Sequence, residues 1–191
     1  MIAAFVGVEG SSRSAVCHAF EVLKVEFGSL TVQRPTGVHI VKPMLAKAIR
    51  ADFEDFRAKV VALEVERSFW EKATILHAEY HRPASQPIRE RFARHYADIA
   101  ALWQHPARAT ALARLDLLAR VAKHKSRFFA SSWANYETAK PGSMKLRPPH
   151  QREPELTRDY NQMEAMFLAK PPSFSEVLTV LGEAEREING T

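Results

Sequence analysis

The sequence has little of what disulfide-bonded or membrane-embedded proteins need. It contains one cysteine, Cys17, so no disulfide can form within the chain, and a reducing compartment fits. No apolar run approaches the ~18 residues that cross a bilayer. The first residues, MIAAFVGVEG, lack the basic region and long apolar core of a signal peptide. We therefore expect a cytoplasmic protein of bacterial type that enters no membrane.

Fingerprints of several enzyme classes are also missing. The sequence contains no G-x-x-x-x-G-K-[ST], G-x-G-x-x-G or H-E-x-x-H motif and no paired cysteines. His77 and His81 are four residues apart and are a candidate metal pair if they share a helix face. No third ligand stands out beside them, and Pro83 disfavours a regular helix end there.

Charge is distributed unevenly along the chain, which carries a formal net charge of +5. Residues 80–129 hold ten Lys or Arg and three acids, whereas residues 150–191 hold eight acids and four Lys or Arg. A basic middle predicts a surface for a polyanion such as RNA, although a solvated helix face explains the same charges. The candidate nucleotide- or RNA-binding residues are Arg82, Arg91, Arg94, Lys123 and Lys125.

Residues 1–65 predict a small lobe that contains β-strands. FEVLKVEFGSLTVQ is typical of two short strands, and GVHIVKP predicts another before Pro43. Residues 44–56 have the apolar spacing of a helix, and residues 59–65 predict a further strand.

Residues 66–191 have helical periodicity and predict a bundle of four or five helices. Ser68-Phe-Trp-Glu71 predicts a capping box, and the helix it starts ends near Tyr80. The next predicted helices span residues 88–104 and 107–131. The fold class is therefore α+β, mostly α.

Two further features of this helical region bear on its packing. The apolar pattern of residues 107–131 predicts burial of Leu112, Leu115, Leu118, Ala122 and the Phe128/Phe129 end. A second capping box, Ser173-Phe-Ser-Glu176, predicts the start of the last helix.

Three residues are candidates for chemistry. Lys72 lies beside bulky aromatic residues and is a candidate phosphate ligand, or simply a surface lysine. Asp98 is the only acid between Arg91 and Asp116, so it is a candidate base or positioning residue, or a partner of Arg94 across one helical turn. If their helices form an antiparallel hairpin, Lys72 and Asp98 approach one cleft.

Glu26, in the middle of a predicted strand, is a weaker candidate for a metal ligand. Carboxylates are depleted in strands, but an edge or solvent-facing position tolerates one. Mg²⁺ is usually held by one or two carboxylates together with substrate phosphates. Glu21 is expected on the opposite side of a regular strand, so no partner is obvious.

Four segments taken together resemble the AbiEii-type nucleotidyltransferase toxins of abortive-infection, type IV toxin–antitoxin systems in bacteria. They are EKATILH, RHY-x-D, HK-x-x-FF-x-x-WA-x-Y and DY-x-x-M-x-x-MF. Each segment alone is weak, but the combination is specific, and the resemblance covers roughly residues 22–189.

The resemblance implies a polymerase-β-like nucleotidyltransferase lobe joined to a helical domain. It implies transfer of a nucleotide from an NTP, with Mg²⁺, to an RNA such as tRNA, and a separate winged-helix antitoxin. Residue by residue, the lysine of the family's EKAT segment corresponds to Lys72 and the aspartate of its RHY-x-D segment to Asp98. Its strand carboxylate corresponds to Glu26, the weakest of the three assignments.

The sequence departs from the family's first motif. That motif is a Gly-Gly or Gly-Ser turn followed by an Asp-x-Asp pair that supplies the main metal ligands, and this chain contains no Asp-x-Asp. We therefore expect residues 1–65 to be the remnant of an incomplete lobe and residues 66–191 to be the helical domain. A truncated product, a mis-called start or half of a split enzyme would be inactive alone, because phosphoryl transfer depends on metal-held charge.

Two alternatives remain open. The chain is a catalytically dead helical RNA-binding module, or it is a protein-interaction module. In the second case, exposed strand edges pair with an N-terminal half, with another chain or with a second copy.

Overall fold

The computed structural model describes residues 5–8, 23–26, 34–42, 57–167 and 169–190. The chain divides into two compact units, Met1–Leu63 and Glu64–Thr191. The predicted helix over residues 44–56 lies outside the described residues, as does Cys17. No helix in the described ranges is long and apolar enough to cross a membrane.

The first unit contains two antiparallel strand pairs. Strand β1 (Phe5–Val8) pairs with β2 (Leu23–Glu26), and β3 (Thr36–Val41) pairs with β4 (Ala58–Leu63). The strands predicted in GVHIVKP and in residues 59–65 are thus confirmed. A two-stranded sheet covers few of its own side chains, and the β3–β4 hairpin accordingly leaves large apolar residues exposed.

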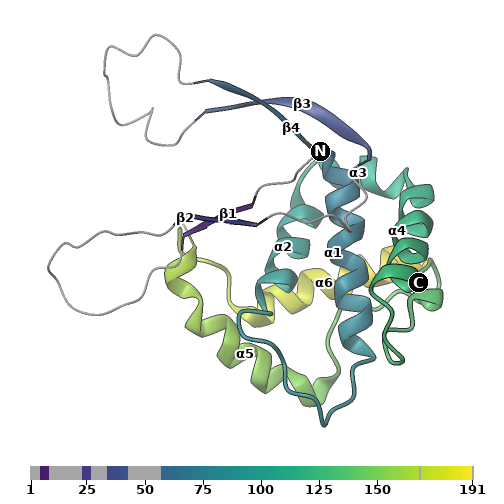
Figure 1. Cartoon of the computed structure of the whole chain (residues 1–191). Helices are drawn as coiled ribbons and strands as arrows, with labels where there is room; N and C mark the ends of the chain where they lie inside the picture. Colours follow the sequence, from purple (N-terminus) through teal and green to yellow (C-terminus); the bar gives the residue numbers. More distant parts are fainter. Residues whose placement is uncertain (1–4, 9–22, 27–33, 43–56, 168, 191) are drawn as a thin grey trace, which may run out of the picture. The chain divides into compact units, whose positions relative to one another are not determined.

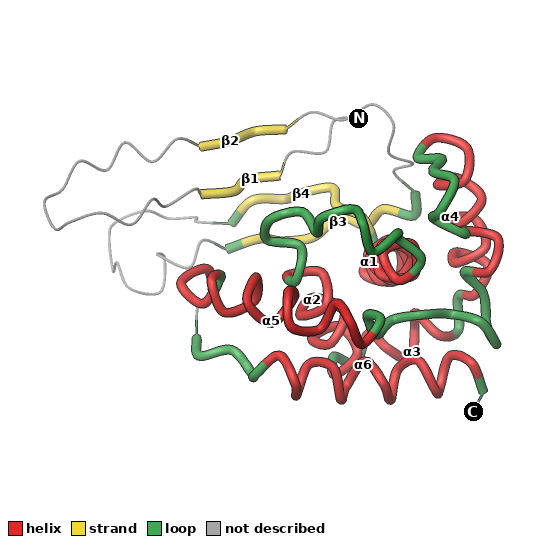
Figure 2. The backbone as a smooth tube through the Cα atoms, turned by 90° about the horizontal axis from the view of Figure 1, so that it is seen from below, coloured by secondary structure: helices red, strands yellow, loops and turns green. Residues whose placement is uncertain are grey.

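The second unit is helical and has α1 at its centre. Helix α1 contacts α2, α3 and α4, and α2 packs on α6 (Figure 1); Figure 2 shows α1 nearly end-on. The helices of the second unit are α1 (Val65–Tyr80), α2 (Arg94–Gln104), α3 (Ala107–Leu112), α4 (Leu115–Phe128), α5 (Glu153–Gln162) and α6 (Phe174–Asn189). Short 3₁₀ turns are η2 (Tyr136–Thr138), η3 (His150–Arg152) and η4 (Glu164–Met166). The predicted class, α+β and mostly α, is confirmed.

The capping box predicted at Ser68 is wrong. Helix α1 begins one turn earlier, its N-cap is Glu64 without a side-chain cap, and the Ser68 amide already donates to the Glu64 carbonyl at 3.1 Å. The Glu71 carboxylate accepts instead from Arg67, with Nε 2.9 Å from Oε1. A stronger, charged donor therefore occupies the carboxylate that the capping box needs.

The single helix predicted over residues 107–131 is two helices. The Trp70 indole N–H donates to the Ala111 carbonyl at 3.0 Å, and the Arg114 amide donates to the same carbonyl at 3.0 Å. In a continuous helix this carbonyl would accept from the amide of Leu115. The chain therefore turns at Ala113 and Arg114, and α4 begins in a new phase.

Burial along α4 matches the predicted pattern in the middle of the helix and differs from it at the two ends. Leu117, Leu118 and Val121 are buried, whereas Leu115 is 44% exposed, Phe128 56% and Phe129 47%. The predicted burial of Leu118 and Ala122 is confirmed. The prediction that Leu115, Phe128 and Phe129 belong to the core is wrong, because these residues lie at the two ends of α4.

Helix α2 starts at Arg94 rather than at residue 88. The Asp159 carboxylate, on α5, accepts from the amides of Arg91 and Ala93, each at 2.7 Å. A carboxylate at a helix N-terminus satisfies free N–H groups and favours the helix dipole. A residue distant in sequence thus sets where α2 begins.

Two polar side chains of α6 fix the extended segment before α5. The Met144 amide donates to Asn189 Oδ1 at 2.9 Å, and Asn189 Nδ2 donates to the Met144 carbonyl at 3.0 Å. Glu185 accepts from the Leu146 amide at 2.7 Å. The start of α6 matches the sequence, because both bonds of the capping box between Ser173 and Glu176 are present.

Replacing Asp159 with alanine should lower the free energy of unfolding by about 1–2 kcal/mol, because two amides at the start of α2 lose their acceptor. Asp159→Asn should cost less, since an amide oxygen still accepts. Chemical denaturation measures both variants. Arg158→Ala, at the exposed neighbouring position, serves as the control, and an equal loss in that variant would contradict the capping role.

Candidate functional site

The structure brings Lys72 of α1 and Asp98 of α2 into direct contact. Lys72 Nζ lies 2.5 Å from Asp98 Oδ2, and the side chains are 32% and 43% exposed. The approach of these two side chains that the sequence suggested is therefore present, and both groups lie at one solvent-accessible point. A cation and a carboxylate at this point can bind an anionic group and accept a proton.

His95 is a third member of this site. It lies one helical turn before Asp98, and burial lowers its pKa to about 4, aided by the positive charges of Lys72 and Arg94 and opposed by Asp98. The imidazole is therefore neutral at neutral pH. The candidates predicted from the sequence did not include His95; its spacing of three residues from Asp98 was the signal that could have found it.

A buried ion cluster supports α1 next to Lys72. Lys125 of α4 donates to the Glu71 carbonyl at 2.6 Å, and its Nζ lies 3.3 Å from Glu71 Oε2. Arg67, 1% exposed, binds the other oxygen of that carboxylate. Burial lowers the pKa of Lys125 to about 8, against the raising effect of Glu71. The cluster holds one turn of α1 against α4, and Lys72 belongs to that turn.

The predicted RNA-binding residues fall into two groups. Lys125 is buried in the cluster above, and Arg82 is 14% exposed, pairs with Glu79 at 3.2 Å and covers the Trp133 ring. Neither presents its charge freely to a surface. Arg91, Arg94 and Lys123 are exposed, and their RNA-binding role stays a prediction.

The described residues do not fit a metal site. They hold no group of three or more His, Cys, Asp or Glu placed to bind an ion. Glu26 ends β2 opposite Phe5, and its predicted metal-binding role stays a prediction.

His77 is a structural histidine rather than one of a metal pair with His81. Its Nε2 lies 3.1 Å from the Asn135 carbonyl oxygen, and its Nδ1 accepts from the Lys145 amide at 3.1 Å. Both ring nitrogens are therefore in use, with the proton on Nε2. Burial lowers the pKa of His77 to about 4.

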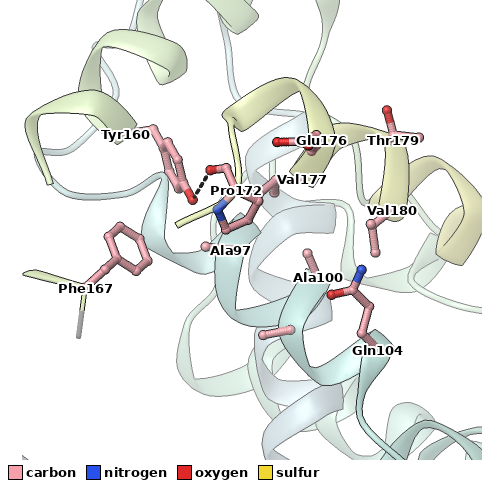
Figure 3. A pocket seen from close by; sticks show the side chains of 11 residues that line it. Ala97, Ala100, Gln104, Tyr160, Phe167, Pro172, Glu176, Val177, Thr179 and Val180 are labelled. Atoms are coloured by element: carbon pink, nitrogen blue, oxygen red, sulfur yellow. Dashed lines mark hydrogen bonds between the residues drawn. The ribbon is translucent and has the colours of Figure 1, made fainter. Parts of the chain in front are cut away.

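An apolar pocket of about 550 Å³ lies on another part of the helical unit, between α2, α6 and the turn before α6. In Figure 3, Tyr160, whose hydroxyl donates to the Pro172 carbonyl at 3.0 Å, and Phe167 flank one side. Glu176 and Gln104 are among its polar lining residues, and no cation lines it. Its lining does not suit a triphosphate, which needs positive charge.

Comparison with known proteins gives a family. A family model described as nucleotidyl transferase AbiEii toxin, type IV TA system, matches residues 18–180, most of the chain. No curated protein and no solved structure matches the chain. The resemblance inferred from the four sequence segments is thereby confirmed.

Neutralising Lys72 should raise the pKa of His95, and neutralising Asp98 should lower it further. Each change removes a charge that acts on the imidazole, but most of the depression should remain because burial is its largest cause. NMR titration of Lys72→Met and Asp98→Asn measures both shifts. Lys123→Met is the control. An unchanged His95 pKa in Lys72→Met would contradict the proximity of the Lys72 charge to His95.

Stability should fall as the pH drops from 6.5 towards 4. The unfolded chain protonates His77 near its ordinary pKa, 6.5, whereas the folded protein holds the pKa of His77 at about 4. Between these values the unfolded state binds more protons, so acid favours unfolding; His95 acts in the same direction.

Urea unfolding at several pH values measures this slope. His77→Gln should flatten it, whereas His150→Gln, whose parent side chain is 97% exposed, should leave it unchanged. An identical slope in His77→Gln and the parent protein would contradict the assignment.

Proposed function

Because the chain belongs to the nucleotidyl transferase AbiEii toxin family of type IV toxin–antitoxin systems, we propose that it takes part in moving a nucleotide from an NTP to an RNA, with tRNA as the acceptor. The observation that carries this proposal is the contact between Lys72 and Asp98, 2.5 Å apart on adjacent helices. Both are positions that the family's segments single out.

The chemistry requires charge neutralisation and a proton acceptor. In nucleotidyl transfer an RNA hydroxyl oxygen bonds to the α-phosphorus, the bond from that phosphorus to the bridging oxygen breaks, and pyrophosphate leaves. Lys72 would leave Asp98 for the triphosphate oxygens and offset their charge. Asp98, freed of its partner, would accept the hydroxyl proton or position that hydroxyl. Neutral His95 would add no further positive charge beside Lys72, so the charge of Asp98 would stay available to the hydroxyl.

The metal needs a separate account. Family members are generally metal-dependent nucleotidyltransferases, yet the described residues do not fit a metal site, so no step here passes through Mg²⁺. We propose that residues 1–65, with Glu26, are the remnant of the nucleotidyltransferase lobe and that residues 66–191 are the helical domain. The missing Asp-x-Asp would leave the chain inactive until another polypeptide supplies it. A winged-helix antitoxin in the cytoplasm would be its further partner.

A second candidate function is a helical RNA-binding or protein-interaction module without catalysis. The contact between Lys72 and Asp98 favours it, because an ordinary surface ion pair without a catalytic role has the same geometry. Such a pair, with both side chains about a third or more exposed, stabilises a fold by about 0–1 kcal/mol.

The deciding experiment measures transfer of label from each of the four NTPs to tRNA, with Mg²⁺. The chain is tested alone and with the N-terminal part of a complete family member that contains Asp-x-Asp. We expect transfer only in the mixture, and at least a hundredfold loss in Lys72→Ala and Asp98→Asn, because the interactions they remove act on the reacting groups.

Arg147→Ala is the matched control, since it removes another half-exposed ion pair, with Glu153, and should leave transfer unchanged. Transfer by the chain alone, lost in Lys72→Ala, would contradict the inactivity but keep the site. Full transfer by the complemented Lys72→Ala variant would refute the site.

A further inference from the structure

The outer face of α4 carries three exposed cations in one row. Arg120, Lys123 and Arg127 are three and four residues apart and therefore share one side of the helix. The other side of the helix packs into the core through Leu118, 2% exposed, and Val121, 0% exposed. The row therefore faces solvent on a helix whose orientation is fixed.

Aromatic rings flank this row at the end of α4. Phe128 is 56% exposed and Phe129 47%, and the His124 ring lies 4.6 Å from the Phe128 ring at an interplanar angle of 34°. A single exposed apolar residue needs no explanation, but two adjacent exposed rings beside a row of cations form a defined patch.

A small pocket borders the other flank of the row. It has a volume of about 330 Å³ and lies between α4 and the segment around η2. Lys123, Ser126, Tyr136 and Lys140 line it, together with Glu137. The Ser126 hydroxyl already donates to the Lys123 carbonyl at 2.9 Å. The two ammonium groups and the Tyr136 hydroxyl remain as donors that suit a phosphate oxygen.

We propose that this surface of α4 binds an unpaired stretch of RNA. The phosphates would follow Arg120, Lys123 and Arg127, and bases would stack on Phe128 and Phe129. Exposed aromatic rings beside cations recognise single strands, because a duplex hides the base faces on which stacking depends. The proposal rests on the proposed function for the role of that RNA as acceptor, whereas the binding itself needs no NTP.

An anionic membrane surface is the other polyanion that cations with apolar side chains attract. A helix that lies in a membrane interface inserts a whole apolar face, and the apolar face of α4 is already buried in the core. The two rings that remain match the size of one or two bases. RNA therefore fits the surface better than a bilayer does.

The test measures binding of a short labelled single-stranded RNA, and of the same RNA as a duplex, to the full chain without NTP. The single strand should bind more tightly. Phe128→Leu with Phe129→Leu, which keeps apolar bulk but removes the rings, should weaken single-strand binding roughly tenfold or more. The duplex affinity and the salt dependence should change little. Leu115→Ala, at another exposed apolar position of α4, is the matched control.

The cations are tested through salt. Lys123→Gln should lower affinity and reduce the slope of log K against log[salt] by about 0.7 for a single-strand contact, whereas Arg147→Gln should not. Equal binding of strand and duplex, or unchanged affinity in the double Leu variant, would overturn the proposal. Binding to anionic vesicles without RNA binding would overturn it in favour of a membrane surface.

These outcomes are separate from those of the transfer assay. RNA binding that depends on the rings, together with no transfer in the complemented mixture, would leave this surface standing and remove the catalytic role.

Discussion

One carboxylate between two buried cations joins helix α1 to helix α4. Glu71 accepts from Arg67 on its own helix and faces Lys125 of α4. Burying charges is unfavourable unless they are paired, so Glu71 is what allows two cations below a tenth exposed to remain inside. The same pairing fixes the rotation of α1 about its axis.

That rotation separates two neighbouring residues of α1. Glu71 turns inward to α4, and Lys72 turns towards Asp98 of α2, where solvent reaches it. The two lysines in this region consequently differ in environment: Lys125 is buried and its pKa is lowered, whereas Lys72 keeps access to an incoming anion. The buried cluster fixes α1 in the orientation in which Lys72 reaches solvent.

Helix boundaries that depend on neighbouring residues were predictable from the sequence, and boundaries that depend on distant contacts were not. Ser68 and Ser173 begin the same four-residue pattern, but only the second forms a capping box, because Glu71 is taken by partners that the pattern does not contain. The start of α2 depends on Asp159, and the break after α3 depends on Trp70, 41 residues before Ala111. Periodicity detected the helices; it could not detect these distant contacts.

The candidate site was likewise predictable from local signals and not from distant contacts. Residue types and family segments singled out Lys72 and Asp98, and their contact needed only the two helices to meet. Charge alone could not distinguish Lys125, which is buried, from Lys123, which is exposed, since helix phase decides that difference. The spacing of His95 from Asp98 was visible in the sequence, but its neutral state comes from burial, which that spacing does not encode.

The three tryptophans of the chain, Trp70, Trp103 and Trp133, all belong to the unit Glu64–Thr191. Trp70 is fully buried and Trp103 is 3% exposed. Intrinsic tryptophan fluorescence therefore originates in the helical unit, since residues 1–63 contain no tryptophan. A single cooperative fluorescence transition in this protein describes one of its two units, and the β-strand unit needs a probe of its own.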